Sequence, residues 1–579
     1  MTAGLQYRTL QTDILILGAG GAGLFAALHA NQVAPELSIT IVVKGLLGKC
    51  GCTRMVQGGY NVALAPGDSV ERHFLDTIEG SQWLADQDLA WTLCSMAIER
   101  VRELENELGC FFDRNPDGSV HQKAFAGQTF DRTVHKGDLT GIEIINRLAE
   151  QVWARDIGRL EDHRAIDLIR TADGSALAGV LLLDIQSGEF VFVQAKAVLL
   201  ATGGGPTMYK YHTPSGDKTA DGLAMALRAG LPLRDMEMVQ FHPTGLLAGP
   251  HTRMTGTVLE EGLRGAGGYL LNGAGERFMH RYDPRNERAT RDIVSRAVYA
   301  EMRAGRTTRN GGVFLQMSHL GPELVRKQFK GMVERCDDCG FDLAGGQVEV
   351  VPTAHYMMGG VCFAPDGTTE LEGLFAAGED TGGVHGANRL GGNGVANSTV
   401  FGGIAGETMG NYVRRRGAFR EPDTRSIEAS IARHEAPFAH RAASLEGIRE
   451  PLFECMWNDV GILRSAEGLR AGLARLDSLD SELARSGVAD DDRGFNLTWQ
   501  DWMNLANLIA VSKVIAAAAL AREDSRGAHY REDFPQPGPM AGSTFTVARQ
   551  QDDALRLTHL PVQFTRVSPG QSLLGSAAD

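Results

Sequence analysis

A strand, a glycine-rich loop and a helical run follow one another near the start of the chain, and they constrain its fold more than any other stretch. Asp13–Leu17 reads DILIL, which is typical of a buried parallel strand. Gly18–Gly23 reads GAGGAG, a GxGxxG pattern, and a helical run begins at Leu24. Such glycines permit a tight turn and let a helix N-terminus face a pyrophosphate. The order predicts a Rossmann-like α/β domain that binds a dinucleotide; a tight packing turn is the alternative.

The residue after the second predicted strand, Ser38–Val43, distinguishes two kinds of dinucleotide. An NAD site prefers an acidic side chain there to hold the ribose hydroxyls, whereas this chain has Lys44. Lys44 therefore weakens an NAD assignment and is compatible with FAD. Four further motifs form a set seen with FAD: Gln57–Gly59, Ala197–Gly205, Asp221–Gly222 and Gly373–Glu379.

Length and charge exclude several classes of protein. With 579 residues the chain is too long for one ordinary domain, so two or three are expected. A formal net charge of −14 argues against nucleic acid as the main partner, because phosphate binding needs a basic face. Eight scattered cysteines without a secretory leader indicate reduced thiols in a cytoplasmic enzyme. No uninterrupted apolar stretch approaches the roughly 18 residues of a membrane span, so membrane contact is expected only through partner subunits.

The chain resembles the flavoprotein subunits of succinate dehydrogenase and fumarate reductase, with L-aspartate oxidase as a close relative. The resemblance extends from about residue 12 to 535. Its carriers are GAGGAG (18–23), QGG (57–59), DMEMVQFHPTG (235–245), EEGLRGAGGYLLNGAGERFM (260–279), RD (291–292), HYMMGG (355–360), HGANRLGGN (385–393) and EDSRGAH (523–529).

The resemblance implies the domain organisation. A Rossmann-like FAD-binding domain is interrupted by an α+β capping domain and is followed by a C-terminal helical domain. The expected limits are 1–240 and 353–421 for the FAD-binding domain, 241–352 for the capping domain, 422–535 for the helical domain and 536–579 for a C-terminal tail. Helical periodicity over Ile427–Leu483 and Trp499–Ala521 agrees with the helical domain. Strands are expected in the tail at Phe545–Val547 and Pro561–Thr565.

A four-carbon dicarboxylate carries two negative charges, and binding it away from water requires matched donors. His242, His355 and Arg389 are suited, and they match the substrate ligands of the family. Arg389 can hold a carboxylate with two hydrogen bonds, which a lysine does less well. A histidine taken alone is more often structural, but these two stand in Gly- or Pro-flanked motifs, which favours substrate binding.

Arg291 matches the active-site acid of the family, and Glu261 and Arg264 stand where the relay that resupplies its proton is expected. Arginine is an unusual acid because its reference pKa is above about 12. In the family, substrate, flavin and neighbouring positive charge crowd it. The alternative for Arg291 is a salt bridge with Asp292 at a helix N-terminus, and that for Glu261 and Arg264 is a solvated i,i+3 pair.

The resemblance also implies the FAD contacts. They are Gly18, Ala19, Gly20, Gly21, Ala22, Gly23, Lys44, Cys52, Thr53, Gln57, Gly58, Gly59, Asp221, Glu379, Gly394 and Val395. Many family members attach FAD covalently through a His placed before QGG, and Cys52 occupies that place here. We expect noncovalent FAD, as in L-aspartate oxidase; a flavin thioether to Cys52 is the alternative.

Two departures bear on the substrate and the flavin. A Thr or Ser usually precedes the Glu of the EG motif and binds the substrate carboxylate, whereas here Glu260 precedes Glu261. Adjacent carboxylates repel unless one is protonated or turned away. Glu260 therefore contacts a substrate that bears an amine, or it points outward while Thr255 or Thr257 takes the Thr role. The GNSLL motif of the family reads GNGVA here, with Ser398 slightly beyond.

No metal site is expected in this chain. Cys336–Cys339 is a CxxC without a second pair at the spacing of a zinc or iron–sulfur site, so it reads as two surface thiols. Any iron–sulfur cluster must therefore come from a partner protein.

The predicted function is the FAD-dependent interconversion of succinate and fumarate, by hydride transfer at flavin N5 and proton transfer from arginine. The chain would be the flavoprotein subunit of a complex with membrane-anchor subunits and an iron–sulfur subunit, on the cytoplasmic face of the inner membrane. The alternatives are L-aspartate oxidase or another soluble dicarboxylate oxidase, and a noncatalytic flavoprotein subunit. The direction of the reaction, the electron partner and the oligomeric state stay open.

Overall fold

A mixed sheet of seven strands forms the centre of the molecule in this computed structural model, which describes residues 6–249, 252, 254–552 and 554–574. The strand order over these residues is β6-β2-β1-β9-β8-β7, and β16 also pairs with β9. Strands β6, β2, β1, β9 and β16 are parallel, whereas β8 and β7 join antiparallel. The bounds are β1 Arg8–Leu17, β2 Ile39–Val42, β6 Gly158–Leu160, β7 His163–Arg170, β8 Leu177–Asp184, β9 Phe190–Leu200 and β16 Leu374–Ala376. The parallel centre confirms the predicted α/β class.

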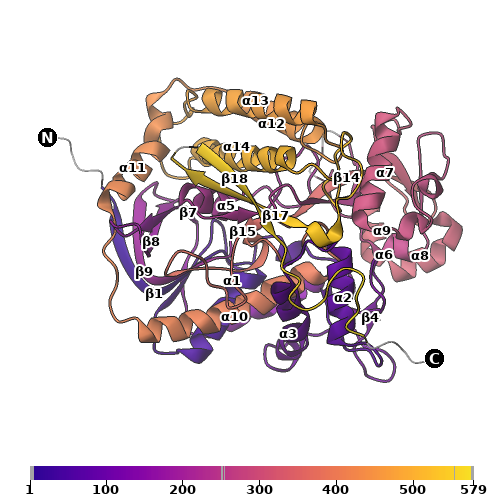
Figure 1. The fold of residues 1–579 in the computed structure, drawn as a ribbon, viewed down its shortest axis with the longest axis horizontal. Helices are drawn as coiled ribbons and strands as arrows, with labels where there is room; N and C mark the ends of the chain where they lie inside the picture. The colour runs from indigo at the N-terminus through magenta and orange to yellow at the C-terminus, as the bar shows by residue number, and fades with distance from the viewer. Residues whose placement is uncertain (1–5, 250–251, 253, 553, 575–579) are drawn as a thin grey trace.

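Two helices pack closely beneath this sheet (Figure 1). Helix α1 (Gly21–Val33) follows β1, and helix α10 (Asn393–Arg415) lies against it although they are far apart in sequence. A Cβ atom on Gly402 would lie 2.6 Å from the backbone oxygen of Ala22, and one on Gly406 would lie 2.3 Å from that of Ala26. Only glycine allows this approach, which sets how closely the middle of α10 packs on the first half of α1.

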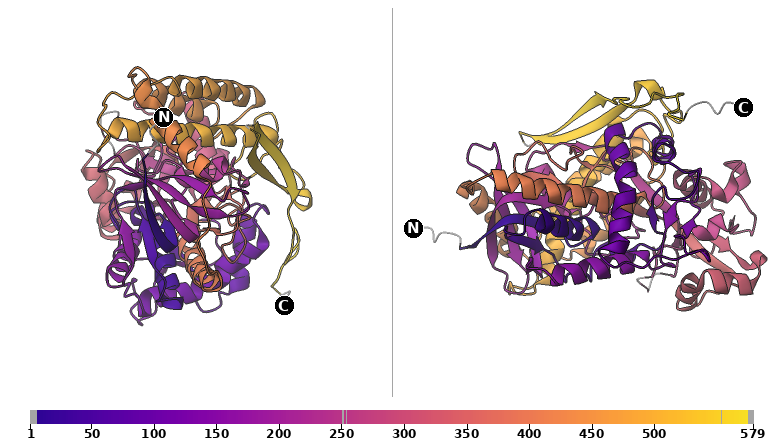
Figure 2. Two further views of the ribbon diagram at one scale, coloured as in Figure 1. Left: turned by 90° about the vertical axis from the view of Figure 1, so that its left-hand side faces the viewer. Right: turned by 90° about the horizontal axis from the view of Figure 1, so that it is seen from below.

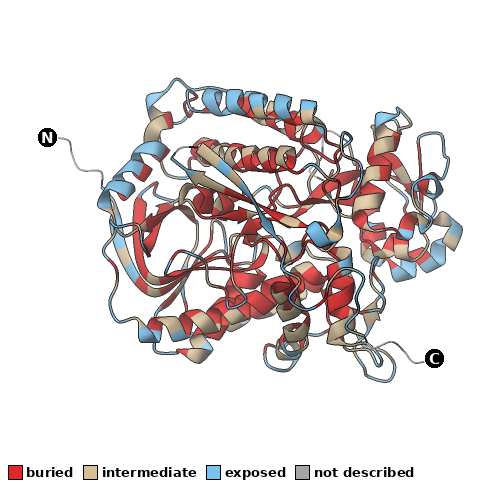
Figure 3. Ribbon diagram, viewed as in Figure 1, coloured by how far each residue is buried: buried red, intermediate tan, exposed pale blue. Residues whose placement is uncertain are grey.

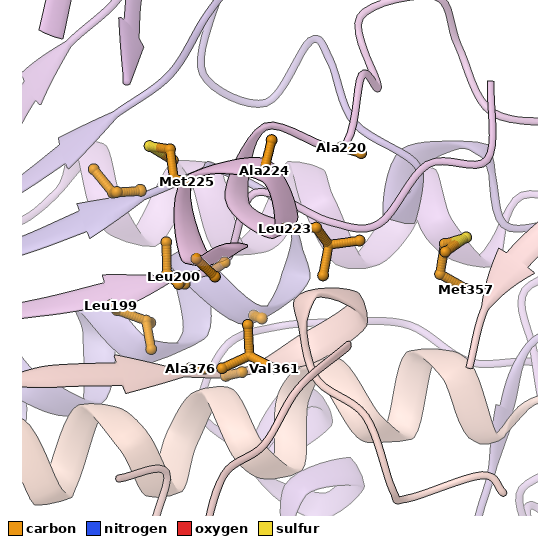
Figure 4. Packing of buried hydrophobic residues seen from close by; sticks show 14 of the residues in the cluster. Leu199, Leu200, Ala220, Leu223, Ala224, Met225, Met357, Val361 and Ala376 are labelled. Carbon is orange, nitrogen blue, oxygen red and sulfur yellow. The ribbon is translucent and has the colours of Figure 1, made fainter. Parts of the chain in front are cut away.

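Helix α5 (Asp221–Arg228) covers the other side of the sheet. Figure 4 shows Leu223, Ala224 and Met225 of α5 packed with Leu199 and Leu200 of β9. The packing places the first residue of α5, Asp221, at the carboxyl end of the parallel strands, where α/β proteins bind ligands. The remaining helices of this region are α2 Val70–Gly80, α3 Gln87–Asn106 and α4 Thr140–Trp153, and a small sheet contains β3 Tyr60–Asn61, β5 Thr133–Val134 and β4 Gln122–Lys123.

A separate lobe, here called the cap, lies to one side of the rest, here called the body (Figures 1 and 2). Its antiparallel sheet has the order β11-β14-β13-β12, and its apolar side chains form a hydrophobic cluster of their own. The bounds are β11 Val239–Leu246, β12 Tyr269–Leu271, β13 Val313–Gln316, β14 Gln347–Met357, α6 Gly262–Gly265, α7 Arg291–Arg303, α8 Pro322–Gln328 and α9 Lys330–Asp337. Strands β11 and β14 extend across the expected limits at 240/241 and 352/353, so they connect the cap to the body; the limits themselves stay predictions.

Four helices follow the second body segment: α11 Thr424–Glu435, α12 Glu446–Asn458, α13 Ala466–Leu483 and α14 Leu497–Ala521. The continuous periodicity expected over Ile427–Leu483 is thus divided among three helices. Figure 3 shows exposed residues along the outer face of α13 and buried residues along α14 beneath it. The combination of body, cap and helical region confirms the predicted architecture.

One helix of the described residues, α14, is long and apolar enough to cross a membrane by length and composition alone. The sequence expectation was that no such stretch exists, because scattered polar residues interrupt the apolar run. The average hydropathy of the helix is nevertheless high, and 67% of its most apolar window is buried inside the protein. This burial is typical of a core helix, and α14 packs on α12, α13 and α5.

The C-terminal tail forms a hairpin that joins the body. Strand β17 (Thr544–Gln551) pairs with β18 (Ala554–Pro561) and with β10 (Leu233–Arg234), which in turn pairs with β15 (Gly360–Val361). The strand expected at Pro561–Thr565 is wrong, because residue-by-residue pairing with β17 ends at Pro561. Hydrogen bonding to a partner strand, which the tail sequence alone does not reveal, sets the limits of β18.

Candidate functional site

The GAGGAG loop forms a cradle of bare backbone at the N-terminus of α1. Gly18 has φ +110°, and a Cβ atom there would lie 2.1 Å from the backbone oxygen of Ala201. A Cβ atom on Gly23 would lie 1.9 Å from the oxygen of Gly18. A Cβ atom on Gly20, the residue that caps the helix, would have no neighbour closer than 3.7 Å. The loop therefore leaves open space in front of the helix N-terminus, as pyrophosphate binding requires.

A cavity extends from this loop to Lys44 and Asp221. The Nζ atom of Lys44 donates to Oδ2 of Asp221 at 2.9 Å, and Nη2 of Arg164 donates to Oδ1 at 2.6 Å. Burial lowers the pKa of Lys44 and opposes ionisation of Asp221, but the two cations hold the Asp221 pKa far below its usual range. Arg164 was not expected from the sequence. Gly18, Ala19 and Gly20 line the same cavity, so these expected FAD contacts lie together.

The QGG loop of the body, Gln57–Gly59, packs against Phe125. Gly59 has φ +137°, and a Cβ atom on Gly58 would lie 2.7 Å from Cζ of Phe125. Among the described residues, the buried Oε1 atom of Gln57 has no hydrogen-bond partner. Nearby, the amide of Gly21 donates to Oγ1 of Thr53 at 3.1 Å. Tight glycines and an unpaired buried oxygen fit a planar ligand such as a flavin.

Two acidic groups that are partly buried, Cys52 and Glu379, lie beside this loop. Burial raises the pKa of the Cys52 thiol to about 12, and the charges of Lys218 and Glu379 act on it in opposite directions. The Glu379 carboxylate accepts a hydrogen bond from the Met357 amide at 2.9 Å, and burial raises its pKa as well. Gly204 lets this carboxylate approach, since a Cβ there would lie 3.0 Å from Cγ of Glu379. Cys52 and Glu379 thus share one partly buried region next to β14.

Helix α10 directs a second N-terminus at the site. Its cap residue Gly392 has φ +90°, and a Cβ there would lie 2.1 Å from Oδ1 of Asn61. A Cβ on Gly394 would lie 2.9 Å from Nη1 of Arg389. Val395 accepts a hydrogen bond from Ser398 Oγ at 2.8 Å. Ser398 also faces Gly21, whose Cβ would lie 2.7 Å from its hydroxyl oxygen, so the serine beyond GNGVA lies beside the GAGGAG loop.

Gln240 joins the two arginines that the sequence assigned to different roles. Its Oε1 atom accepts from Nη1 of Arg291 at 3.2 Å and from Nη2 of Arg389 at 3.1 Å. Its Nε2 atom donates to Oδ1 of Asn388 at 3.0 Å and to the backbone oxygen of Arg389 at 2.8 Å. The amide is therefore fixed in orientation, and it holds two guanidinium groups side by side in a buried space.

The expected relay residues lie behind Arg291. The Nε atom of Arg291 donates to Oε2 of Glu261 at 2.7 Å, and Oε1 of Glu261 accepts from the Ala126 amide at 3.0 Å. Nη2 of Arg264 lies 4.0 Å from Oε2 of Glu261, and its Nη1 donates to the Glu287 backbone oxygen at 2.7 Å. Burial opposes ionisation of Glu261, but Arg291 and Arg264 lower its pKa, so it stays a carboxylate. Arg291, Glu261 and Arg264 thus follow one another in the order expected for the relay.

The two expected histidines lie together across the pocket. The rings of His242 and His355 have centroids 5.4 Å apart, and Thr213 Oγ1 lies 2.8 Å from Nδ1 of His355. Burial, followed by the positive charge of Arg291, holds the pKa of both imidazoles well below the usual range. Burial and the charge of Arg291 also lower the pKa of Arg389, to about 10. Both histidines are therefore neutral at pH 7.

The charges of this pocket fit a small dianion. Arg264, Arg291 and Arg389 contribute three positive charges, and Glu261 contributes one negative charge. With neutral histidines, two positive charges remain without a matching carboxylate in this group. Among the described residues, the buried Nε atom of Arg389 also has no hydrogen-bond partner. A ligand with two carboxylates would supply both the charge and the acceptors.

Glu260 does not share these contacts. Its Oε2 atom lies 3.6 Å from Nζ of Lys123, and its charged neighbours are Lys123, Asp138 and Arg335. None of the pocket arginines is among them, so the geometry gives no support to the expected substrate contact. The Thr255 hydroxyl donates to the Gly249 backbone oxygen at 2.9 Å.

Sequence reasoning missed Gln240, Phe125 and Arg164. Gln240 lies inside the DMEMVQFHPTG motif, directly before Phe241, so its place in the motif was an available signal. Phe125 and Arg164 stand outside every motif, and only the fold brings them to the site. Over the residues that the structure describes, no group of three or more His, Cys, Asp and Glu side chains is arranged to hold a metal ion.

Known proteins resemble this chain over most of its length. The family described as FAD binding domain matches residues 13–395, and the family described as Fumarate reductase flavoprotein C-term matches residues 449–573. One of the subunits of the fumarate reductase (CoM/CoB) of Methanothermobacter marburgensis is 42% identical, and the alignment covers 91% of this chain and 95% of that protein. The succinate dehydrogenase flavoprotein subunit of Coxiella burnetii is 35% identical, with coverage of 91% and 93%.

Solved structures give the same result. The FrdA chain of E. coli quinol fumarate reductase superposes with a TM-score of 0.92 at 33% identity, over 97% of this chain and 99% of that one. The match covers body, cap and helical region together. The chain therefore belongs to the family of fumarate reductase and succinate dehydrogenase flavoprotein subunits, and it is an FAD-dependent oxidoreductase.

Proposed function

We propose that this chain interconverts succinate and fumarate as the flavoprotein subunit of a larger complex. The observation that carries the proposal is the placement of Arg291 and Arg389 on one amide oxygen of Gln240, with Glu261 behind Arg291. Two cations held side by side can bind and act on a four-carbon dianion, and only one of them has a carboxylate partner that could return a proton.

Arg389 binds one substrate carboxylate in this scheme. Its Nη atoms already contact Gln240 and the Leu390 backbone oxygen, so its orientation is set before substrate arrives. Arg389 also lies over the ring of Tyr356, with Cζ 4.5 Å from the centroid. His242 and His355, held neutral, donate or accept hydrogen bonds at the other end of the substrate. Burial of the pocket strengthens each of these contacts because water is excluded.

Arg291 is the proton donor for fumarate reduction and the acceptor for succinate oxidation. The carboxylate of Glu261 contacts its Nε atom at 2.7 Å and can exchange a proton with it. Arg264, whose Nη2 lies 4.0 Å from the same carboxylate oxygen, stabilises the charge of Glu261 and completes the relay. FAD, when bound beside the QGG loop, supplies the hydride acceptor or donor of the reaction.

FAD is held without a covalent bond in this proposal. Burial keeps the Cys52 thiol protonated, and a thiol is a far weaker nucleophile than a thiolate. The cofactor is bound through backbone groups of the glycines at 18–23 and of the QGG loop, and through the charges of Lys44 and Asp221. The comparisons support FAD itself, and the mode of attachment is our inference from the burial of Cys52.

The electron partner is an iron–sulfur protein, and membrane-anchor subunits complete the complex on the cytoplasmic face of the inner membrane. Support comes from the relatives, whose names describe them as subunits.

The test is an assay of the purified FAD-loaded chain with succinate, fumarate and aspartate, using artificial electron carriers. Turnover of succinate and fumarate supports the proposal. Hydrogen peroxide formed from aspartate would instead support an L-aspartate oxidase. Stoichiometric FAD without turnover of any four-carbon acid would support a noncatalytic subunit. Copurification of the native assembly identifies the partners.

A further inference from the structure

The two adjacent glutamates of the EEGLRG segment lie at the boundary between cap and body and make different contacts there. Glu261 contacts Arg291 of cap helix α7, whereas Glu260 faces Lys123 of body strand β4, with 3.6 Å between Oε2 and Nζ. Glu260 is only 5% exposed, and the Lys123 side chain is 22% exposed. A buried carboxylate next to the proposed relay requires an explanation, because the relay itself does not use it.

The body segment 123–127 contacts the relay on several sides. Lys123 faces Glu260, and the Ala126 amide donates to Oε1 of Glu261 at 3.0 Å. Between them, Phe125 lies against the QGG loop and against Gly391, whose Cβ would be 2.5 Å from its ring and 3.1 Å from Nη2 of Arg291. A Cβ on Gly127 would lie 3.3 Å from Thr290, the residue that precedes α7. One short stretch of the body therefore touches the flavin side of the site, the acid and both glutamates.

Lys123 is held on the body by its own contacts. Its Nζ atom donates to the Gly137 backbone oxygen at 2.9 Å, in the loop that follows β5. On the cap side, Glu260 directly precedes Glu261, so the placement of one side chain constrains the other. The ion pair thus links a fixed point of the body to the segment of the cap that carries the relay.

We propose that the Lys123–Glu260 pair is a latch between body and cap that positions Glu261 against Arg291, and that Glu260 is a positioning residue and not a substrate ligand. The latch sets the register of segment 260–265 on segment 123–127. Only the kinetic consequence of this proposal rests on the proposed succinate–fumarate chemistry.

The neighbours of Glu260 suit such a role. Burial raises the pKa of Glu260, whereas Lys123 and Arg335 attract its carboxylate and oppose that rise, and Asp138 repels it. The cost of burying a charged pair offsets much of its attraction, so such a pair adds specificity of placement more than stability. We therefore expect removal of the pair to loosen the boundary locally while leaving the melting temperature of the protein nearly unchanged.

The first test measures amide hydrogen exchange in the full-length FAD-loaded protein. Glu260→Gln removes the charge and keeps the shape of the side chain, and Lys123→Met removes the other partner. Each is expected to speed exchange about threefold or more in both segments, 123–127 and 260–265. Lys513→Met is the matched control, because Lys513 of α14 pairs with Asp480 of α13 at 2.7 Å and its side chain is 25% exposed, close to the 22% of Lys123. It should leave both segments unchanged.

The second test measures turnover of fumarate with an artificial electron donor. Each single variant should lower kcat about five- to tenfold and change KM by less than about twofold, because a misplaced relay slows proton transfer without removing a substrate contact. The reversed pair, Lys123→Glu with Glu260→Lys, should recover at least about half of the kcat and restore slow exchange.

Three results would overturn the latch. The first is unchanged amide exchange in both segments of Glu260→Gln. The second is a KM that rises about tenfold at constant kcat, as expected for a substrate contact. The third is a reversed pair whose kcat and amide exchange are no closer to wild type than those of the single variants. If no four-carbon acid is turned over, the proposed function fails, and the exchange measurement still decides whether the pair holds the boundary. If Glu260→Gln does not fold, Lys123→Met gives the same test.

Discussion

Nε of Arg291 lies 2.7 Å from Oε2 of Glu261, and both side chains are buried. In the proposed mechanism, this contact lets a residue with a high pKa act as an acid, because the carboxylate can return its proton. An arginine that has given its proton to the substrate can regain one through the carboxylate, so the deprotonated guanidine need not persist in the pocket. Glu261 lies on the Nε side of Arg291 and Gln240 contacts its Nη1, so the relay and the amide do not compete for the same atom.

Arg291→Lys and Arg291→Gln should each abolish most turnover and keep FAD. Loss of a general acid costs about 100- to 10,000-fold in rate, and Arg291 contacts none of the glycines of the cradle around residues 18–23. The measurement is kcat for fumarate reduction together with the flavin-to-protein ratio. Arg285→Lys is the control, because Arg285 is an exposed residue whose side chain bonds Asp283. Turnover near the wild-type level in Arg291→Lys would remove the proton-donor assignment.

Gln240→Leu should raise KM for succinate and fumarate more than it lowers kcat. The variant removes one acceptor shared by Arg291 and Arg389 and leaves two buried guanidinium groups to repel each other. A hydrogen bond to a charged group contributes about 1.5–3 kcal/mol, so KM should rise roughly tenfold or more.

Gln240→Glu separates charge from shape. A carboxylate between the arginines cancels one of the two unmatched positive charges, so affinity for a dianion should fall further than in Gln240→Leu. Isothermal titration with a nonreacting dicarboxylate such as malonate measures this directly. Equal binding by wild type and both variants would show that Gln240 does not organise the pocket.

Acid precipitation of the purified protein should release its flavin into the supernatant. Burial raises the pKa of Cys52 to about 12, so the thiol is protonated at neutral pH and forms no thioether. Cys52→Ser should therefore retain FAD at the wild-type ratio. Flavin fluorescence that stays with the denatured wild-type chain, and disappears in Cys52→Ser, would establish the covalent alternative.

Gly406→Val should destabilise the protein and reduce FAD binding together. The new Cβ would lie 2.3 Å from the Ala26 oxygen, so α10 must move away from α1, and the two helix N-termini at the cofactor would separate. Overpacking of this kind costs about 1–3 kcal/mol. Thermal unfolding with and without added FAD measures the effect. Gly417→Ala, at an exposed position with no atom within 4 Å of its Cβ, is the control and should change neither property.

The sequence predicted those parts of the site that depend on local backbone. The glycines at 18, 23 and 59 are required by contacts within their own turns or with adjacent strands, so a motif read along the chain locates them. The motifs likewise placed Arg291, Glu261 and Arg264 in one pocket, which the structure brings together in the expected order.

Contacts between distant segments could not be read from the sequence. Gln240 and Arg389 are 149 positions apart, and nothing in either motif states that one amide serves both arginines. The direction of Glu260 depends on Lys123 of the body, which belongs to no motif. A sequence motif shows which chemical groups a residue carries and which residues adjoin it along the chain. The contacts that its side chain makes across a domain boundary depend on the whole fold.

His29 should stabilise the protein most at mildly acidic pH. In α1 its ring nitrogens lie 2.8 Å from Oε1 of Glu103 on α3 and 2.8 Å from Oε1 of Glu407 on α10. Burial opposes protonation and Arg100 repels the charged ring, but the two carboxylates prevail and raise the pKa of His29. A raised folded-state pKa means that the stabilisation is fully present below the unfolded pKa of about 6.5, and it is lost as pH rises through the folded-state pKa.

Glu407 sets the lower limit of the pH range in which its contact with His29 stabilises the protein. Its hydrogen bond to His29, with the charge of Arg100, lowers its pKa to about 2. Its stabilisation is present above the unfolded pKa of about 4.5 and is lost as pH falls toward about 2. His29→Gln should therefore lower the free energy of unfolding by on the order of 1 kcal/mol near pH 5.5, with the difference shrinking above pH 7. Urea unfolding of both proteins across pH 5 to 9 measures this, and a difference that grows with pH would show that His29 is neutral in the folded protein.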